Sequence, residues 1–163
     1  MAVMHSQSLA SHTVASRALL AIAALTLLAG VFSVQAAPPD PKVLAYTLPD
    51  KIPWVKNGGG AEQAVLAGDP SKPGLYVVLT KWTAHHMSHP HFHPNNRYIY
   101  VISGTWWVGT GPKYDPDSTT PMPAGTFVTH YAKQIHYDGA KDGDVVLEIV
   151  GMGPATSTPA EQK

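Results

Sequence analysis

The 163-residue sequence contains no cysteine. This absence excludes disulfide bonds, thiolate metal sites and cysteine nucleophiles in one step. Any metal ion must therefore be held by nitrogen and oxygen atoms, and the nine histidines are the main source of such ligands.

Charge is also scarce, and neither sign dominates. Charged residues make up 13% of the chain, and 11 basic residues balance 11 acidic ones. A chain without excess positive charge has no net electrostatic attraction to nucleic acid or to anionic lipid. By contrast, glycine and proline are frequent, with 14 and 15 residues. Frequent turn residues favour short strands over long helices. We expect one all-β domain.

A long apolar run occurs only near the N-terminus. Arg17 precedes the apolar residues 18–32, and Val34-Gln35-Ala36 supplies the small-residue pattern of a signal-peptidase site. We expect residues 1–36 to be a signal peptide. A membrane anchor is the alternative, but the run is shorter than the ~20 residues that a spanning helix needs. The protein is then exported, periplasmic or secreted, with no stable membrane anchor after cleavage.

The mature sequence divides into three segments. Residues 37–74 are expected to be an N-terminal extension with one edge strand at 43–47, residues 75–150 the core of a small barrel or sandwich, and residues 151–163 a weakly ordered C-terminal tail. Alternating and apolar runs bounded by turn residues predict strands at 75–82, 98–102, 105–108, 126–131, 135–137 and 145–150. Ser103-Gly104 between two of these runs predicts a hairpin, and residues 109–123 and 138–144 are expected to be loops.

Five of the nine histidines fall in residues 85–93. His91 and His93 are two apart, so in a strand both side chains leave on the same face. Neutral imidazole is the commonest protein metal ligand, and this pair could hold one ion. The alternative for each histidine alone is a surface or core residue hydrogen-bonded to the backbone.

These residues resemble the first motif of the cupin superfamily, which runs Gly, five residues, His-x-His, three or four residues, Glu, six residues, Gly. His91, His93 and Gly104 keep the spacing, while His85 stands at the first glycine and Arg97 at the glutamate. The second cupin motif is matched by Gly125 and His136, with other marks replaced.

The chain also resembles a group of small single-domain cupins, often exported, without one established activity. The matching segments are His93-Pro94, 101–106, 123–128 and Gly153-Pro154. This resemblance implies an antiparallel cupin β-barrel, or jelly roll, and a homodimer formed through edge strands. It also implies that His91, His93 and His136 bind one divalent transition metal, for which Fe, Zn, Ni, Co and Cu are the candidates.

Three imidazoles leave metal positions open to water or substrate, as in catalytic sites. The resemblance therefore implies a metal-dependent enzyme that acts on a small organic molecule, either an iron dioxygenase or a zinc or nickel isomerase, lyase or hydrolase. The alternative is a non-catalytic cupin that binds a small ligand or a metal.

The sequence does not determine the roles of three further side chains, those of Arg97, His89 and His130. Arg97 could clamp a substrate carboxylate or enolate beside the metal, or turn outward to pair with an acid such as Asp138 or Glu148. His89 could be a fourth ligand, a base, or an exposed loop histidine. His130 could orient a ligand imidazole.

Overall fold

A computed structural model describes residues 36–163 of the chain. The predicted signal peptide lies outside the described residues except for Ala36. No helix in the part that the structure describes is long and apolar enough to cross a membrane.

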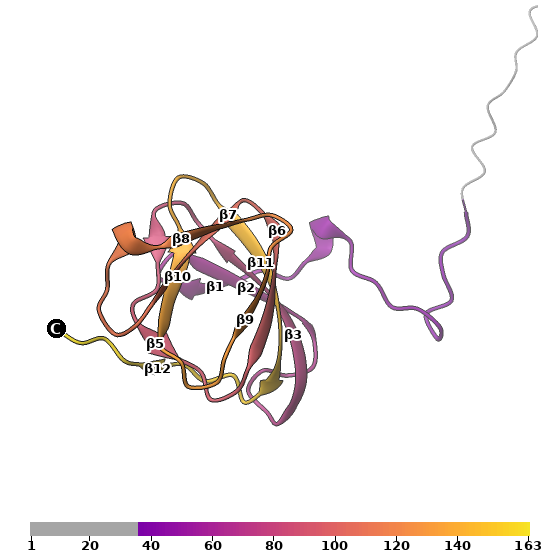
Figure 1. Ribbon diagram of the computed structural model, residues 1–163. Helices are drawn as coiled ribbons and strands as arrows, with labels where there is room; N and C mark the ends of the chain where they lie inside the picture. Colours follow the sequence, from indigo (N-terminus) through magenta and orange to yellow (C-terminus); the bar gives the residue numbers. More distant parts are fainter. Residues whose placement is uncertain (1–35) are drawn as a thin grey trace, which may run out of the picture. The chain divides into compact units, whose positions relative to one another are not determined.

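The all-β prediction is confirmed: residues 45–163 form two antiparallel sheets that face each other as a jelly roll (Figure 1). The first sheet consists, in spatial order, of β1 (Val55–Gly58), β2 (Ala61–Ala67), β3 (Gly74–Trp82), β11 (Val145–Gly153), β6 (Arg97–Ser103) and β9 (Phe127–His130). The second consists of β12 (Thr158–Pro159), β5 (His91–Phe92), β10 (His136–Ala140), β7 (Thr105–Thr110) and β8 (Thr120–Pro123), with β4 (His86–Met87) also paired to β10. Two short 3-10 turns, η1 (Pro49–Lys51) and η2 (Pro116–Ser118), complete the elements.

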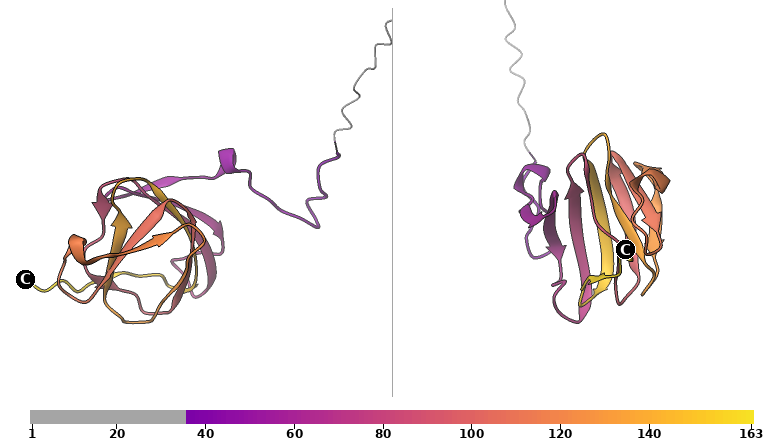
Figure 2. Two further views of the ribbon diagram at one scale, coloured as in Figure 1. Left: turned by 45° about the horizontal axis from the view of Figure 1, so that its top comes forward. Right: turned by 90° about the vertical axis from the view of Figure 1, so that its left-hand side faces the viewer.

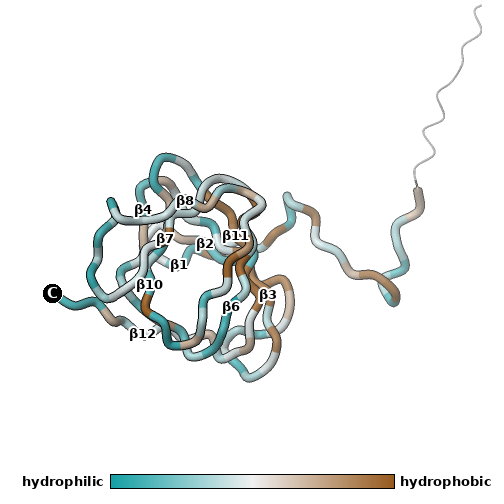
Figure 3. The backbone as a smooth tube through the Cα atoms, viewed as in Figure 1, coloured by the Kyte–Doolittle hydropathy of each residue, from teal (hydrophilic) through white to brown (hydrophobic). Residues whose placement is uncertain are grey.

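Strand alternation produces the core between the sheets. On β3, Tyr76 and Val78 are buried, whereas Leu75 is exposed on the outer face. The buried partners from β6, β7 and β11 include Ile99, Val101, Trp106, Val145 and Leu147. The strands β3 and β11 are accordingly the most apolar stretches of the fold (Figure 3). Apolar burial of this kind supplies most of the free energy of folding.

The predicted strands 75–82, 98–102, 105–108 and 145–150 are confirmed within one to three residues of their bounds. The predicted hairpin at Gly104 is wrong, because β6 belongs to the first sheet and β7 to the second. Gly104 has a φ of 78°, and a Cβ there would lie 2.2 Å from the Asp144 carbonyl oxygen. Glycine is therefore required where the chain crosses between sheets rather than where it folds back.

The edge strand predicted at 43–47 is also wrong. The Asp40 carbonyl accepts from the N–H groups of Val43 and Leu44, and the Asp40 side chain accepts from the N–H of Lys42. These local bonds replace a sheet ladder. The edge of the first sheet is instead β1, which pairs with β2.

The C-terminal tail is better ordered than predicted. Residues 151–153 continue β11, and β12 pairs with β5. Beyond these strands, the N–H of Ala160 donates to the Pro90 carbonyl and that of Gln162 to the Pro112 carbonyl. The tail therefore runs beside β5 and Pro90, and Figure 2 shows the yellow C-terminal segment running along the domain.

The loops at 109–123 and 138–144 are shorter than predicted. The strand β8 occupies the end of the first, and β10 extends through Ala140 into the second. This extension places Asp138 on a buried strand instead of a polar loop.

Candidate metal and anion site

Three histidines, two from strands of the second sheet and one directly after β5, cluster beside the cavity between the sheets, which His91 and His93 line. His91 lies on β5, directly opposite His136 on β10 in the strand register. His93 follows β5, and its ring centroid lies 4.9 Å from that of His91 and 5.3 Å from that of His136. One ligand atom from each of the three lies within 4.8 Å of the others. The three predicted ligands are therefore brought together.

Each of these imidazoles is oriented by a backbone carbonyl. The Nδ1 atoms of His91, His93 and His136 lie 2.8, 2.8 and 3.0 Å from the carbonyl oxygens of His89, Thr156 and Gln134. A carbonyl oxygen only accepts, so each Nδ1 carries the hydrogen and each Nε2 presents its lone pair. The Nε2 atoms of His93 and His136 are buried without a hydrogen-bond partner. Such a donor set fits a transition metal, since a bound ion would satisfy both orphaned atoms.

A second group with metal-compatible spacing shares His136 and adds His130 and Asp138. In this second group, the tautomer of His130 is unfavourable for metal binding. The Arg97 Nη2 atom lies 3.2 Å from His130 Nδ1, and a guanidinium only donates. The Nε2 atom of neutral His130 therefore carries a hydrogen and cannot be a ligand. His130 instead lies against His136, with ring centroids 3.8 Å apart.

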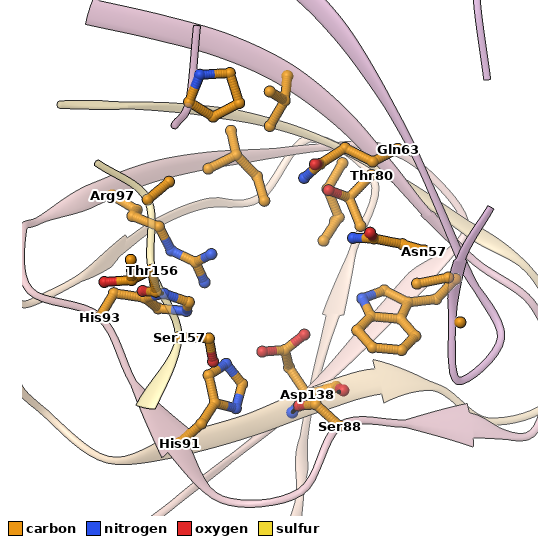
Figure 4. Close-up of a pocket in the computed structure, with 18 of the residues that line it drawn as sticks. Asn57, Gln63, Thr80, Ser88, His91, His93, Arg97, Asp138, Thr156 and Ser157 are labelled. Atoms are coloured by element: carbon orange, nitrogen blue, oxygen red, sulfur yellow. Dashed lines mark hydrogen bonds between the residues drawn. The ribbon is translucent and has the colours of Figure 1, made fainter. Parts of the chain in front are cut away.

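Arg97 points into the cavity rather than outward (Figure 4). It lies opposite His130 on β9 and Gly151 on β11, and its Nε atom is buried without a partner. No carboxylate of the described residues lies within 4.0 Å of its guanidinium. The alternative of an outward ion pair with Asp138 or Glu148 is therefore wrong, and the cavity holds a cation without a direct counter-ion.

Burial and the Arg97 charge disfavour protonated histidine here. Burial is the main cause that lowers the pKa of His93 to about 3, and the Arg97 charge is the next. Burial also lowers the pKa of His136 to about 4, against the opposing charge of Asp138. It likewise holds the pKa of His130 far below its usual value. These imidazoles are neutral at pH 7, which is the state that binds metals.

Asp138 is a cavity residue that the sequence analysis placed wrongly, in a polar loop. It is the one acidic side chain that lines the cavity among the described residues. Its Oδ1 accepts from Trp106 Nε1 at 3.2 Å, and its Oδ2 lies 3.9 Å from His136 Nε2. The sequence does contain a signal for this position. His136 and Asp138 are two residues apart, and alternate residues of a strand share a face.

His89 is separate from the ligand cluster. Its side chain is exposed, its Nδ1 lies 3.0 Å from Glu161 Oε2, and its ring stacks on Tyr114. It lines the cavity but belongs to neither group of metal-compatible residues. The structure thus places His89 at the rim, held by the C-terminal tail.

Comparison with known protein families shows to which family the chain belongs. The sequence model of the ChrR cupin-like domain matches residues 43–156, which is most of the chain. This chain belongs to the ChrR cupin-like family. The predicted membership of the cupin superfamily is thereby confirmed. No curated protein matches the chain significantly.

Solved structures agree with this cupin fold. The polyketide cyclase RemF from Streptomyces resistomycificus is 14% identical with a TM-score of 0.61, over 74% of this chain and 87% of that one. An RmlC-like cupin from Shewanella frigidimarina is 16% identical with a TM-score of 0.54, over 68% and 90%. The anti-sigma factor ChrR of Rhodobacter sphaeroides, solved in complex with SigE, is 17% identical with a TM-score of 0.50, over 65% and 51%. At these identities the likeness concerns the fold alone.

Proposed function

We propose that this ChrR cupin-like protein is an exported, metal-dependent enzyme that acts on a small organic anion. One observation carries the proposal: His91 and His93, which cluster with His136, line the same cavity as a guanidinium that has no carboxylate partner. His91, His93 and His136 would hold one divalent transition metal, of which Fe, Zn, Ni, Co and Cu are the candidates.

The metal would supply Lewis-acid polarisation or a site for oxygen. Arg97 clamps the carboxylate or enolate of the substrate, because an anion between the guanidinium and a dication relieves their mutual repulsion. Asp138 lies beside His136 and is the cavity's proton acceptor. A buried acceptor next to a polarised anion favours the isomerase or lyase class, and an oxygenase reaction is the other class to be tested.

The test uses the mature chain, residues 37–163, loaded separately with each of the five metals. We expect about one metal ion per chain and turnover of at least one member of a panel of carboxylates, diketones and thiols. Oxygen uptake measured with Fe(II) separates oxygenation from isomerisation or elimination. Absence of metal binding for all five ions would refute the proposal.

A non-catalytic cupin that binds a small ligand or a metal is the second candidate. Arg97 in the place of the motif's glutamate favours it, and so does the match to a family named for ChrR, which is described as an anti-sigma factor in Rhodobacter sphaeroides. Stoichiometric metal together with carboxylate binding, but without turnover of any panel member, would establish this candidate over the enzyme.

We also propose that the protein is a homodimer. The edge strand β9 presents Phe127 with an exposed fraction of 63%, and its ring stacks with that of Tyr98 on β6 at a centroid distance of 6.4 Å. An aromatic cluster beside an open sheet edge supports pairing with a second copy.

In sedimentation experiments, we expect Phe127→Lys to shift the wild-type dimer to a monomer without loss of folding, because the side chain is exposed. The matched control is Tyr131→Lys, which changes another exposed aromatic residue beyond the end of β9. A monomeric wild type would contradict the dimer, and equal behaviour of the two variants would contradict an interface at Phe127.

A further inference from the structure

The cavity contains a buried hydroxyl group that has no role in the proposed metal site or in anion binding by Arg97. The Oγ1 atom of Thr80 is buried, has no hydrogen-bond partner and lines the cavity. The residue as a whole is only 8% exposed. It lies on β3, and its inward neighbours on that strand are the apolar Val78 and the aromatic Tyr76 and Trp82.

An unpartnered buried hydroxyl is unfavourable for folding by itself. Its transfer from water without a compensating hydrogen bond costs free energy, whereas valine has nearly the same shape and no such cost. The position therefore holds a group that the folded chain alone does not satisfy. A ligand in the cavity is the available partner, because the cavity is what Thr80 faces.

Two amide side chains accompany this hydroxyl. Gln63 on β2 lies opposite Thr80 in the strand register, and Asn57 comes from β1. Figure 4 shows the three side chains together on the wall across the cavity from Arg97, His91 and His93. We call Asn57, Gln63 and Thr80 the polar wall. Its groups are neutral, and each both donates and accepts hydrogen bonds.

The cavity thus has two chemically different ends. One end carries the guanidinium and the imidazoles, and the polar wall forms the other. Its volume of about 770 Å³ lies within the range of small-molecule sites. A ligand that satisfies both ends needs an anionic group at one terminus and a hydroxyl or carbonyl group at the other.

We propose that the substrate is a small carboxylate with a hydroxyl or carbonyl oxygen distant from the carboxylate, and that the polar wall binds this oxygen. The inference rests on the anion-binding role of Arg97 in the proposed function. Thr80 is then a specificity-determining residue, which favours acids with a distant oxygen over acids with purely apolar tails. The preference arises because only the distant oxygen pairs with the buried hydroxyl on binding.

The test measures binding by calorimetry to the zinc-loaded mature chain. The probes are ω-hydroxy carboxylates of four to six carbons, each paired with the unsubstituted acid, so that only the distant hydroxyl differs. For the best-fitting length we expect the hydroxy acid to bind about 3–10-fold more tightly, which corresponds to one net hydrogen bond. Thr80→Val should remove this preference and leave the affinity for the unsubstituted acid and for zinc unchanged.

The same variant gives a readout that is independent of any ligand. Because Thr80→Val removes the orphaned hydroxyl from the free protein, we expect its melting temperature to rise by about 2–5 °C. The matched control is Thr83→Val, an exposed position outside the residues that line the cavity, where neither binding nor melting temperature should change.

The outcomes separate this inference from the proposed function. Equal affinities for each hydroxy acid and the matching unsubstituted acid, with no change in Thr80→Val, would contradict the ligand-binding role of the polar wall. The anion-binding role of Arg97 would not be affected by this result. Zinc binding without binding of any carboxylate would overturn the role of Arg97 and the polar wall together. A lower melting temperature of Thr80→Val would show that the hydroxyl stabilises the fold, which would overturn the premise that a ligand satisfies it.

Discussion

Replacement of Arg97 by glutamate is expected to tighten zinc binding at least tenfold and to weaken carboxylate binding by about 10–100-fold. The first effect arises because the variant exchanges a cation beside the ion for the carboxylate that the cupin motif carries at this place. The second arises because a charge-assisted hydrogen bond contributes about 1.5–3 kcal/mol. Calorimetric titrations with zinc and with a carboxylate measure both changes.

Arg97→Met is the control for this exchange. It removes the guanidinium without adding a ligand, so carboxylate binding should be lost while zinc affinity rises less than in Arg97→Glu. Both variants also release His130 Nδ1 from its donor, since the Arg97 Nη2 contact at 3.2 Å disappears. If carboxylate affinity were the same in the wild type and both variants, Arg97 would have a structural role only.

Loss of His136 is expected to weaken zinc binding by more than about 100-fold. His136→Ala removes one of three nitrogen ligands, whereas loss of an outer-shell partner alone typically costs 10–100-fold. Competition with a chromophoric chelator measures the dissociation constant. The control is His89→Ala, because His89 is exposed and pairs with Glu161. Its zinc affinity should equal that of the wild type.

Further variants separate the two groups of residues that share His136. If His91 and His93 complete the site, His93→Ala should lose zinc to a similar extent, while Asp138→Asn should keep the affinity within a few fold. The opposite result would move the ion to the group of His130, His136 and Asp138. The first outcome is expected because Arg97 fixes His130 in the tautomer that cannot bind a metal at Nε2.

Local patterns in the sequence were sufficient for the long strands β3, β6, β7 and β11, but not for β1 and β2, and the resemblance to the cupin motifs indicated the ligand triad. Alternation along residues 75–82 predicted the inward Tyr76 and Val78 without knowledge of any partner strand, because side-chain direction in a strand depends only on the pleat. The spacing of His91, His93 and His136 within two cupin motifs predicted their convergence, which the structure shows. Membership of the cupin superfamily followed from the same residues.

The sheet to which each strand belongs was not available from local patterns. A turn such as Ser103-Gly104 looks the same whether the chain folds back into one sheet or crosses to the facing one. The bounds of β10 were equally undetermined, because Gly139 and Asp138 are typical of loops. Only the pairing of β10 with β4, β5 and β7 made Asp138 a buried strand residue.

By itself, then, the sequence determined an all-β chain through short-range periodicity, and its resemblance to the two cupin motifs indicated a cupin in which His91, His93 and His136 meet. The tertiary structure alone decided that Arg97 faces the cavity, that three backbone carbonyls direct the Nε2 lone pairs of the histidines inward, and that Thr80 is buried unpaired. Each of these depends on groups that are distant in the chain and meet only when the two sheets close over one another.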